Sequence, residues 1–243
     1  MSEKKILDDA SVIVATHNRL SMLKDLLDSL SKMSAFPGEV IIVDDGSEKV
    51  VSSHVNTEKY PYSIKTIRNS IPQGPAKTRN IGVHNSKGDI IAFTDDDCIV
   101  EKQWLNSLYK TLKKSKEKLG GVGGKVKAYN NDIFSRYYEF NSILEPRPHD
   151  RDHPHRIPYL VTANCAIKRD AFMRAGGFDE KIKKAGGEDC AMSMRMAKIG
   201  YYFEKEERAV INHRFKKGFR NMFRTFFWYG KGGRYVVDRY LPL

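Results

Sequence analysis

The chain is poor in cysteine and lacks any apolar run long enough to cross a membrane. Its three cysteines, Cys98, Cys165 and Cys190, form no CxxC pair, which argues against a structural zinc site or a disulfide framework. No stretch approaches the roughly 18 consecutive apolar residues of a membrane-spanning helix. The first five residues lack the apolar core of a signal peptide. We therefore expect a cytoplasmic protein, either free or peripheral on the inner face of the membrane.

The composition restricts the class of protein further. The 243 residues suit one large domain or one domain with a short appendage, and a hydrophobic content of 40% excludes wholesale disorder. The formal net charge of +12 favours anionic partners such as nucleotides, phospholipid headgroups or nucleic acid. The charge alone does not choose among these partners.

Apolar runs of strand length alternate with helical patterns in the first half of the chain. The runs typical of buried strands are residues 11–15, 39–43, 63–67 and 90–93. Apolar residues recur at helical spacing in residues 20–33, 75–83 and 101–118. This order predicts a doubly wound, mostly parallel α/β sheet flanked by helices. No GxGxxG follows the first strand, and we expect the glycine-rich residues 120–124 to be a connector.

The second half is less regular. The expected elements are a helix at 133–144, a loop at 146–158, a strand at 159–167, a helix from Glu188 to Gly200 and a strand or hairpin at 201–212. The loop contains His149, His153 and His155, but their spacing fits no familiar zinc site. A solvated loop is therefore the favoured interpretation.

Three consecutive carboxylates, Asp95, Asp96 and Asp97, follow the buried run at 90–93. Several like charges cannot be buried without partners, so these acids must face water or a cation at the carboxyl end of the strand. Ligands bind at that end in open α/β sheets. If the chain stays extended, Asp95 and Asp97 point the same way and could hold a hard divalent cation. The alternative is an acidic turn after an edge strand.

Two further acidic pairs stand at element ends, Asp44-Asp45 after the second strand and Glu188-Asp189 at a helix start. A bound nucleoside diphosphate needs a group for its base, a metal for its phosphates and a carboxylate beside the reacting carbon. Two carboxylates with different tasks would supply a metal ligand and a general base. Taken alone, Asp189 is typical of a helix-capping acid.

Six short segments are distinctive when taken together: VIVATHNR at 12–19, IVDDGS at 42–47, GPAKTRNIG at 74–82, FTDDD at 93–97, GGFD at 176–179 and GED at 187–189. They occur in the order found in family 2 glycosyltransferases, and the chain resembles that family from Ser11 to His213. The resemblance implies a GT-A fold and an enzyme that moves a sugar from a nucleoside diphosphate donor, UDP being expected. The acceptor would be a hydroxyl group of a lipid-linked glycan or another glycan, and the transfer would invert the anomeric carbon.

The resemblance also implies roles for the residues of the nucleotide site. Ala15 and His17 would line the base, Asp45 would hydrogen-bond its imino edge, and Arg79 would reach the same region. Asp95 would lie near the ribose. The other residues expected to contact the nucleotide sugar are Arg19, Asp96 and Glu188.

The metal and the catalytic base follow from the same resemblance. Asp95 and Asp97 match the D-x-D motif, in which Asp97 is the expected ligand of Mn²⁺ or Mg²⁺. Asp189 matches the base that deprotonates the acceptor hydroxyl. His213 is either a further metal or phosphate ligand or a polar residue at a strand end. Two residues depart from the family pattern, Cys98 where a further acid is frequent and His17 where tyrosine is common.

The last part of the chain is basic and aromatic. Its phenylalanines recur near helical spacing with lysines and arginines between them, which predicts a basic amphipathic helix. An anionic membrane, the catalytic domain or a second copy in a homodimer could cover the aromatic face, and membrane or lipid-linked acceptor contact is favoured. We expect Gly230-Lys231-Gly232-Gly233 to loosen the chain.

We therefore divide the chain into a catalytic domain of residues 1–213 and a basic amphipathic segment of residues 214–243. Within the domain, about 10–125 would bind the nucleotide sugar and about 126–213 the acceptor. The alternatives are a sugar nucleotidyltransferase and a non-enzymatic basic module for membrane or nucleic acid. Nucleic acid is not expected, because the acidic sites would repel a phosphate backbone.

Overall fold

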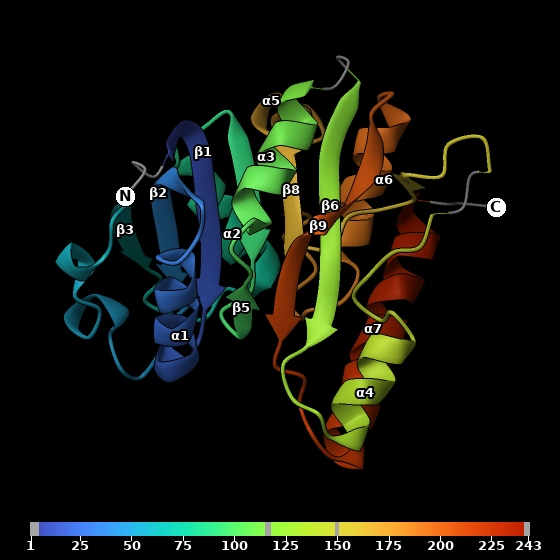
Figure 1. Cartoon of the computed structure of the whole chain (residues 1–243). Helices are drawn as coiled ribbons and strands as arrows, with labels where there is room; N and C mark the ends of the chain where they lie inside the picture. Colours follow the sequence, from blue (N-terminus) through green and yellow to red (C-terminus); the bar gives the residue numbers. More distant parts are fainter. Residues whose placement is uncertain (1–4, 115–117, 149–150, 241–243) are drawn as a thin grey trace.

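Four parallel strands form the first half of one nine-stranded sheet in the computed structural model, which describes residues 5–114, 118–148 and 151–240 (Figure 1). They are β1 (Lys5–Thr16), β2 (Ala35–Asp44), β3 (Ser63–Arg68) and β4 (Ile90–Thr94). Helix α1 (Leu20–Leu30) connects β1 to β2, and α2 (Pro75–His84) precedes β4. Two short 3₁₀ helices, η1 (Val51–Ser53) and η2 (Thr57–Lys59), lie between β2 and β3. The repeated crossovers confirm the predicted α/β class.

The second half of the sheet mixes strand directions. The strand order is β3-β2-β1-β4-β8-β6-β9-β5, with β7 paired to β9. The strands of this half are β5 (Cys98–Val100), β6 (Leu119–Ala128), β7 (Arg156–Ile157), β8 (Asn164–Lys168) and β9 (Tyr202–His213). Strand β8 runs antiparallel to both β4 and β6, whereas β6 and β9 are parallel. The parallel region therefore adjoins a mixed one.

Helices cover both faces of the sheet and build two cores. Helices α1 and α3 (Trp104–Lys114) pack on one face, where Trp104 is fully buried. Helices α2, α5 (Arg169–Arg174) and α6 (Glu188–Lys198) pack on the other. The remaining helices, α4 (Ile133–Phe140) and α7 (Phe219–Tyr240), lie side by side beyond the second half of the sheet (Figure 1).

The pair Pro37-Gly38 lies inside β2, so the expectation that strand structure starts only at Glu39 is wrong. The register of β1 against β2 shifts at this point, from Leu7 opposite Pro37 to Ser11 opposite Glu39. A β-bulge tolerates a proline, which has no N–H to donate to the ladder. A Cβ on Gly38 would come within 2.6 Å of the Asp8 carbonyl oxygen, so the close approach needs glycine.

The glycine-rich residues 120–124 are part of β6 rather than a connector, which corrects our expectation. Strand β6 lies between β8 and β9, and all five residues are buried. A Cβ on Gly121 would meet the Leu160 side chain at 2.5 Å, and one on Gly124 would meet the Asn164 amide at 2.5 Å. Glycine at these positions therefore leaves room for neighbouring groups. Local sequence rules assign a glycine-rich segment to a turn, because they do not include such packing contacts.

The segment Gly230-Lys231-Gly232-Gly233 continues α7 without a break, so the expected loosening is also wrong. Gly232 packs against the backbone of Gly186 and Gly187, the loop that enters α6. This tertiary contact stabilises a helical stretch that intrinsic propensity disfavours.

Other boundaries differ by a few residues. Helix α4 ends at Phe140 instead of 144, β8 starts at Asn164 instead of 159, and the short helix α5 was not expected. In the expected loop, residues 156–157 form β7, whereas His149 lies outside the described residues.

We expect Gly124→Ala to lower the free energy of unfolding by about 1–3 kcal/mol, because the added methyl group would press on backbone and on the buried Asn164. Urea denaturation followed by circular dichroism measures this change. The control is Gly230→Ala, whose Cβ would meet nothing within 4 Å and which should stabilise α7 by up to about 1 kcal/mol. Equal stabilities of the two variants would contradict this account of β6.

Candidate active site

A cavity of about 720 Å³ opens where the carboxyl ends of β1, β2 and β4 meet the end of β9 and the inner face of α7. It brings together residues that lie up to about 200 positions apart in the sequence. The expected site residues in its wall are Ala15, His17, Arg19, Asp45, Arg79, Asp95, Asp96, Asp97 and His213. Glu188 accepts a hydrogen bond from Arg79 in this wall, and Asp189 follows Glu188 at the start of α6. Neither acid is among the residues that line the cavity.

The acidic run after β4 forms a turn, so the extended arrangement considered for Asp95 and Asp97 is wrong. Each carboxylate has a different set of partners. Asp95 pairs with Arg79 at 2.8 Å, whereas Asp96 and Asp97 share Nη1 of Arg19 at 2.8 and 2.6 Å. Asp96 also accepts a hydrogen bond from Thr16 Oγ1 at 2.7 Å.

Burial and the two arginines have opposite effects on the pKa values of the carboxyl groups in this turn. Burial would raise the pKa of Asp95, but the guanidinium of Arg79 and the nearby His213 hold that pKa below its usual value. Asp96 behaves in the opposite way, because burial and the charge of Asp97 raise its pKa to about 6 even though Arg19 opposes the shift. The turn therefore holds carboxyl groups of clearly different acidity.

Asp97 and His213 form the part of the cavity that could bind a metal. Asp97 Oδ1 lies 3.3 Å from His213 Nε2, yet Asp97 Oδ1 and His213 Nδ1 are buried and have no hydrogen-bond partner among the described residues. With Cys98 they form a group whose ligand atoms lie within 4.8 Å of one another. A carboxylate and an imidazole suit Mn²⁺, whereas the thiol is a softer ligand. An orphaned carboxylate oxygen beside an imidazole fits the implied divalent ion.

Arg79 links the acidic turn to the start of α6. Its side chain is 8% exposed, and Nη2 reaches Asp95 while Nη1 reaches Glu188 Oε1 at 3.0 Å. Glu188 is also buried, and its Oε2 accepts a hydrogen bond from the Gly186 backbone at 2.7 Å. Arg79 lines the cavity together with Ala15 and His17, and its guanidinium also joins two acidic elements.

Asp189 is the second residue of α6 and is partly exposed. Burial of its carboxyl group, together with the negative charge of Glu188, raises the pKa of Asp189 to about 7, although Arg79 opposes the shift. The Cys190 backbone N–H donates to Asp189 Oδ1 at 2.9 Å. A carboxyl group with a pKa near neutrality can take up a proton in a reaction at physiological pH.

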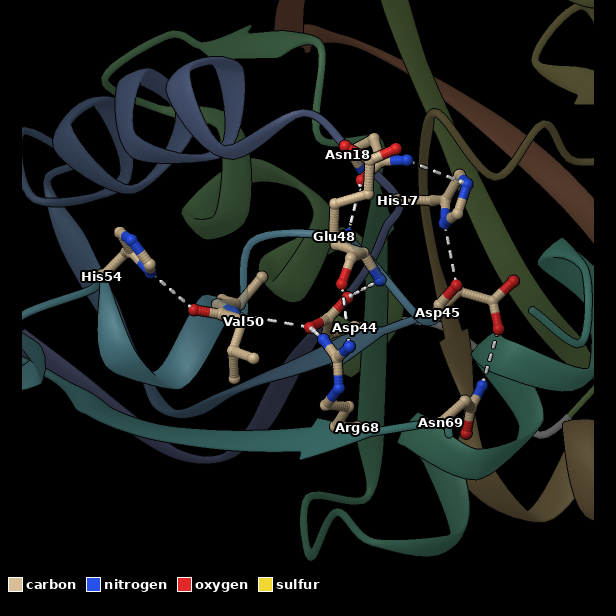
Figure 2. Close-up of polar contacts among 11 residues, drawn as sticks. His17, Asn18, Asp44, Asp45, Glu48, Val50, His54, Arg68 and Asn69 are labelled. Atoms are coloured by element: carbon tan, nitrogen blue, oxygen red, sulfur yellow. Dashed lines mark hydrogen bonds and ion pairs between the residues drawn. The ribbon is translucent and has the colours of Figure 1, made fainter. Parts of the chain in front are cut away.

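The loops after β1 and β2 form the opposite end of the cavity (Figure 2). His17 Nδ1 donates to the Asp45 carbonyl oxygen at 2.8 Å, and Asn18 Nδ2 lies 3.4 Å from His17 Nε2. Because a carbonyl only accepts, Nδ1 carries the proton and Nε2 is free to accept from Asn18.

The carboxylate of Asp45 also organises the loop before α2. Asp45 Oδ1 accepts from Asn69 Nδ2 at 2.7 Å (Figure 2). Oδ1 also accepts from the Gln73 backbone N–H at 2.8 Å, and Oδ2 accepts from the Gly74 backbone N–H at 2.9 Å. Its neighbour Asp44 is buried and ion-paired with Arg68. The Asp44-Asp45 pair is thus partly structural, and Asp45 Oδ2 retains capacity for a second donor.

Several parts of the cavity wall were missed by sequence reasoning. They include residues 183–185, residues 214–216 after β9, Tyr138 and Leu144, and the inner face of α7 with Asn221, Arg224, Thr225, Trp228 and Tyr229. The amphipathic pattern of α7 was visible in the sequence. Its direction of packing was not, because aromatic residues lie on both faces of the helix.

The model of the family described as glycosyl transferase family 2 matches residues 11–176. An uncharacterized glycosyltransferase of Haemophilus influenzae is 42% identical over 87 residues, which are 36% of this chain and 29% of that protein. Polypeptide N-acetylgalactosaminyltransferase 13 of Rattus norvegicus is 26% identical over 87% of this chain and 42% of its own length. Glucosyl-dolichyl phosphate glucuronosyltransferase of Haloferax volcanii is 24% identical over 96% of this chain and 78% of its own. The chain spans less than half the length of the first two relatives.

Solved structures share the fold. GalNAc-T7 with UDP, GalNAc and Mn²⁺ has a TM-score of 0.71 at 18% identity and covers 86% of this chain and 43% of its own. The mannosyltransferase PcManGT of Pyrobaculum calidifontis, in complex with GDP-Man and Mn²⁺, has a TM-score of 0.69 at 20% identity over 93% of this chain and 64% of its own. TarS 1–349 of S. aureus has a TM-score of 0.67 at 23% identity over 85% and 60%. At these identities the likeness concerns the fold alone. Among the described residues, none of the helices has the length and apolarity to span a bilayer.

We expect Arg79→Met to lower the free energy of unfolding by about 3–5 kcal/mol, because it leaves Glu188 and Asp95 without their buried cation. Chemical denaturation measures the effect. The matched control is Lys59→Met, which removes a solvent-exposed pair with Asp28 and should change stability by less than about 1 kcal/mol. A wild-type stability for the Arg79 variant would show that the bridge does not hold the site together.

Proposed function

The chain belongs to glycosyl transferase family 2, and we propose that it transfers a sugar from a nucleoside diphosphate sugar to a hydroxyl group of an acceptor. One observation carries this proposal. The Asp97–His213 pair, the Asp95–Arg79–Glu188 bridge and the neutral-range carboxyl group of Asp189 meet at the carboxyl edge of one sheet. This arrangement would provide a cation site and a general base at the edge where α/β sheets bind ligands, which supports the proposal.

The proposed donor is a UDP-sugar. Its base would lie between Ala15 and His17, and Asp45 Oδ2 would accept a hydrogen bond from the imino group. The spare lone pair of Asp45 Oδ2 supports this role. Two of the similar structures, GalNAc-T7 and TarS 1–349, are complexes with UDP or UDP-GlcNAc, whereas PcManGT is a complex with GDP-Man, which makes GDP the alternative to test.

We propose that Asp97 and His213 hold Mn²⁺ or Mg²⁺ and that Asp95 lies near the ribose. When bound, the ion would neutralise the charge of the leaving diphosphate. Arg19 Nη1 lies 2.6 Å from Asp97 Oδ2, so the other carboxylate oxygen, Oδ1, is left to face a cation. Asp96 and Glu188 complete the set of residues proposed to act on the donor. Asp96 would act through the Thr16 hydroxyl group, which donates a hydrogen bond to it, and Glu188 would act through Arg79.

Asp189 is the proposed catalytic base. It would take the proton from the acceptor hydroxyl while the oxygen attacks the anomeric carbon from the face opposite the diphosphate. One displacement of this kind inverts the anomeric configuration. The bridge through Arg79 and Glu188 fixes the start of α6, so Asp189 is held in one position relative to the acidic turn.

The proposed acceptor is a hydroxyl group of a glycan, including a lipid-linked glycan. The Haloferax volcanii relative is named for a glucosyl-dolichyl phosphate, which supports a lipid-linked acceptor. We further propose that about residues 10–125 bind the donor and about 126–213 the acceptor. Residues 214–243 would contact an anionic membrane peripherally or a second copy of the chain.

Release of nucleoside diphosphate from a panel of UDP-, GDP- and TDP-sugars, with Mn²⁺ and then with EDTA, tests the proposal. We expect slow hydrolysis of one donor that EDTA abolishes and that Asp97→Ala removes. Asp189→Asn should lower turnover by about 10²–10⁴-fold while donor affinity by calorimetry stays unchanged. Asp28→Asn, an exposed acid in α1, is the control. Donor affinity lost in Asp189→Asn with normal turnover at saturation would overturn the role of the base, and no donor binding at all would overturn the function.

The pH dependence gives a separate test of Asp189. A general base acts in its deprotonated form, and its pKa is raised to about 7. Transfer should therefore be maximal above pH 7 and kcat/KM should fall by about tenfold for each pH unit below it. Steady-state rates with a saturating metal check this profile. A flat profile between pH 5 and pH 8 at constant donor affinity would exclude Asp189 as the base, for a base with pKa about 7 titrates within that range.

A further inference from the structure

Exposed large apolar side chains gather on α4 and α7. Seven of the twelve exposed large hydrophobic residues within the described part of the chain belong to these two helices. They are Ile133, Tyr137 and Phe140 on α4, and Phe219, Phe223, Phe227 and Val237 on α7. We call this set the aromatic surface. Such a concentration differs from the single exposed apolar residues that any protein surface carries.

The aromatic surface is continuous across the two helices. Phe219, Phe223 and Phe227 are spaced by four residues, lie on one side of α7 and are 80%, 75% and 55% exposed. The ring of Phe134 on α4 meets that of Phe219 at 5.0 Å, so the N-terminal turns of both helices are in contact. In Figure 1 the two helices run alongside each other at the edge of the molecule.

The domain covers the opposite side of α7. Met222 and Phe226 pack against the core that includes Tyr138, and Val236 is buried beside Ile182 and Ala191. The helix is therefore held in place by its inner face. The catalytic domain was one of the three partners considered for this helix from the sequence. It covers the inner face of α7 and leaves the aromatic surface exposed.

Positive charge flanks the aromatic surface. Helix α7 contains five arginines or lysines and one acid, Asp238, which pairs with Arg234. Arg220, Arg224 and Lys231 have no ion pair with any described residue. Arg220 and Arg224 follow Phe219 and Phe223 around the helix by the 100° that each residue turns. Lys231 lies one turn beyond Phe227, and its Nζ is 5.3 Å from the centre of the Trp228 ring. An apolar stripe beside unpaired cations is the pattern of a helix that lies in the headgroup region of an anionic membrane.

We propose that α4 and α7 dock the protein on an anionic lipid bilayer, with the aromatic surface inserted among the lipids, Arg220 and Lys231 at the headgroups, and Arg224 at the boundary between the headgroups and the cavity wall. A second copy of the chain is the less favourable occupant. A two-fold contact through this surface would place the same unpaired cations of both copies against one another. Lipid phosphates offer the opposite charge.

Docking would bring the active site to the membrane. Arg224 and Trp228 line the cavity from the side of α7 that adjoins the aromatic stripe. A helix with its side chains is about 10–12 Å across, so the cavity wall would lie within about one helix diameter of the headgroups. This placement predicts that the acceptor hydroxyl belongs to a lipid or a lipid-linked glycan, a prediction that rests on the proposed function.

Sedimentation of the full chain with phosphatidylcholine vesicles, with and without phosphatidylglycerol, tests the proposal. We expect binding to the anionic vesicles, and weaker binding at about 1 M salt, where the Debye length is about 3 Å. The double variant Phe219→Ser and Phe223→Ser should bind at least about tenfold more weakly. Arg220→Glu should also weaken binding to anionic vesicles, whereas Lys110→Glu on α3 should not.

The matched control is Ile6→Ser with Ile199→Ser, which removes two exposed apolar side chains from other surfaces and should leave vesicle binding unchanged. Thermal melts establish that each variant is folded. Absence of wild-type binding to anionic vesicles, or equal loss in the control, would overturn the docking surface. A dimer in analytical ultracentrifugation that the Phe219 and Phe223 variant converts to a monomer, without any vesicle binding by the wild type, would also overturn it.

Calorimetry with UDP and Mn²⁺ separates the two proposals, because donor binding without vesicle binding refutes only the docking surface. Vesicle binding without donor binding refutes only the proposed function.

Discussion

The active site depends on the neutralisation of buried carboxylates at one edge of the sheet. Four of the five carboxyl groups at Asp95, Asp96, Asp97, Glu188 and Asp189 are ion-paired with two arginines, Arg19 and Arg79, each of which bridges two carboxylates. Buried charges of one sign repel strongly, so they persist only where cations pair with them. Two guanidinium groups do not balance five carboxyl groups. The result is partial neutralisation, which appears as the raised pKa values of Asp96 and Asp189 and as the unpaired oxygen of Asp97. The same deficit of positive charge suits a divalent cation, within a chain whose net charge is +12.

Glycines connect the last helix to this site. Gly232 in α7 packs on Gly186 and Gly187, and the second of these adopts a left-handed conformation as the N-cap of α6. Side chains at these positions would push α7 away from the loop that carries Glu188 and Asp189. Helix α7 thus serves as a wall of the cavity with one face and presents its aromatic surface with the other. The amphipathic segment and the catalytic domain therefore form one packed structure, although their sequences differ sharply in character.

Local patterns predicted the first half of the fold well. The uniform apolar runs of β1, β2 and β4 and the helical stripe of α1 are local signals, and the structure confirms the elements they indicated. The errors fall where packing overrides local preference. Glycines at 120–124 permit close strand contacts inside the sheet, Pro37 occupies a bulge, and Gly232 is helical because a partner loop lies against it. In each case the deciding neighbour is distant in sequence, so no local rule contains it.

The sequence by itself determined the α/β class, the family resemblance and the identity of the acidic residues gathered at the cavity, because these follow from periodicity and from motifs at strand ends. It could not determine how those residues are paired. That Arg79 joins Asp95 to Glu188, that Asp97 faces His213, and that α7 closes one side of the cavity all depend on contacts between segments about 100 residues apart. Tertiary structure alone decided these pairings, because burial sets which charges must compensate one another and the fold sets which of them are near enough to do so.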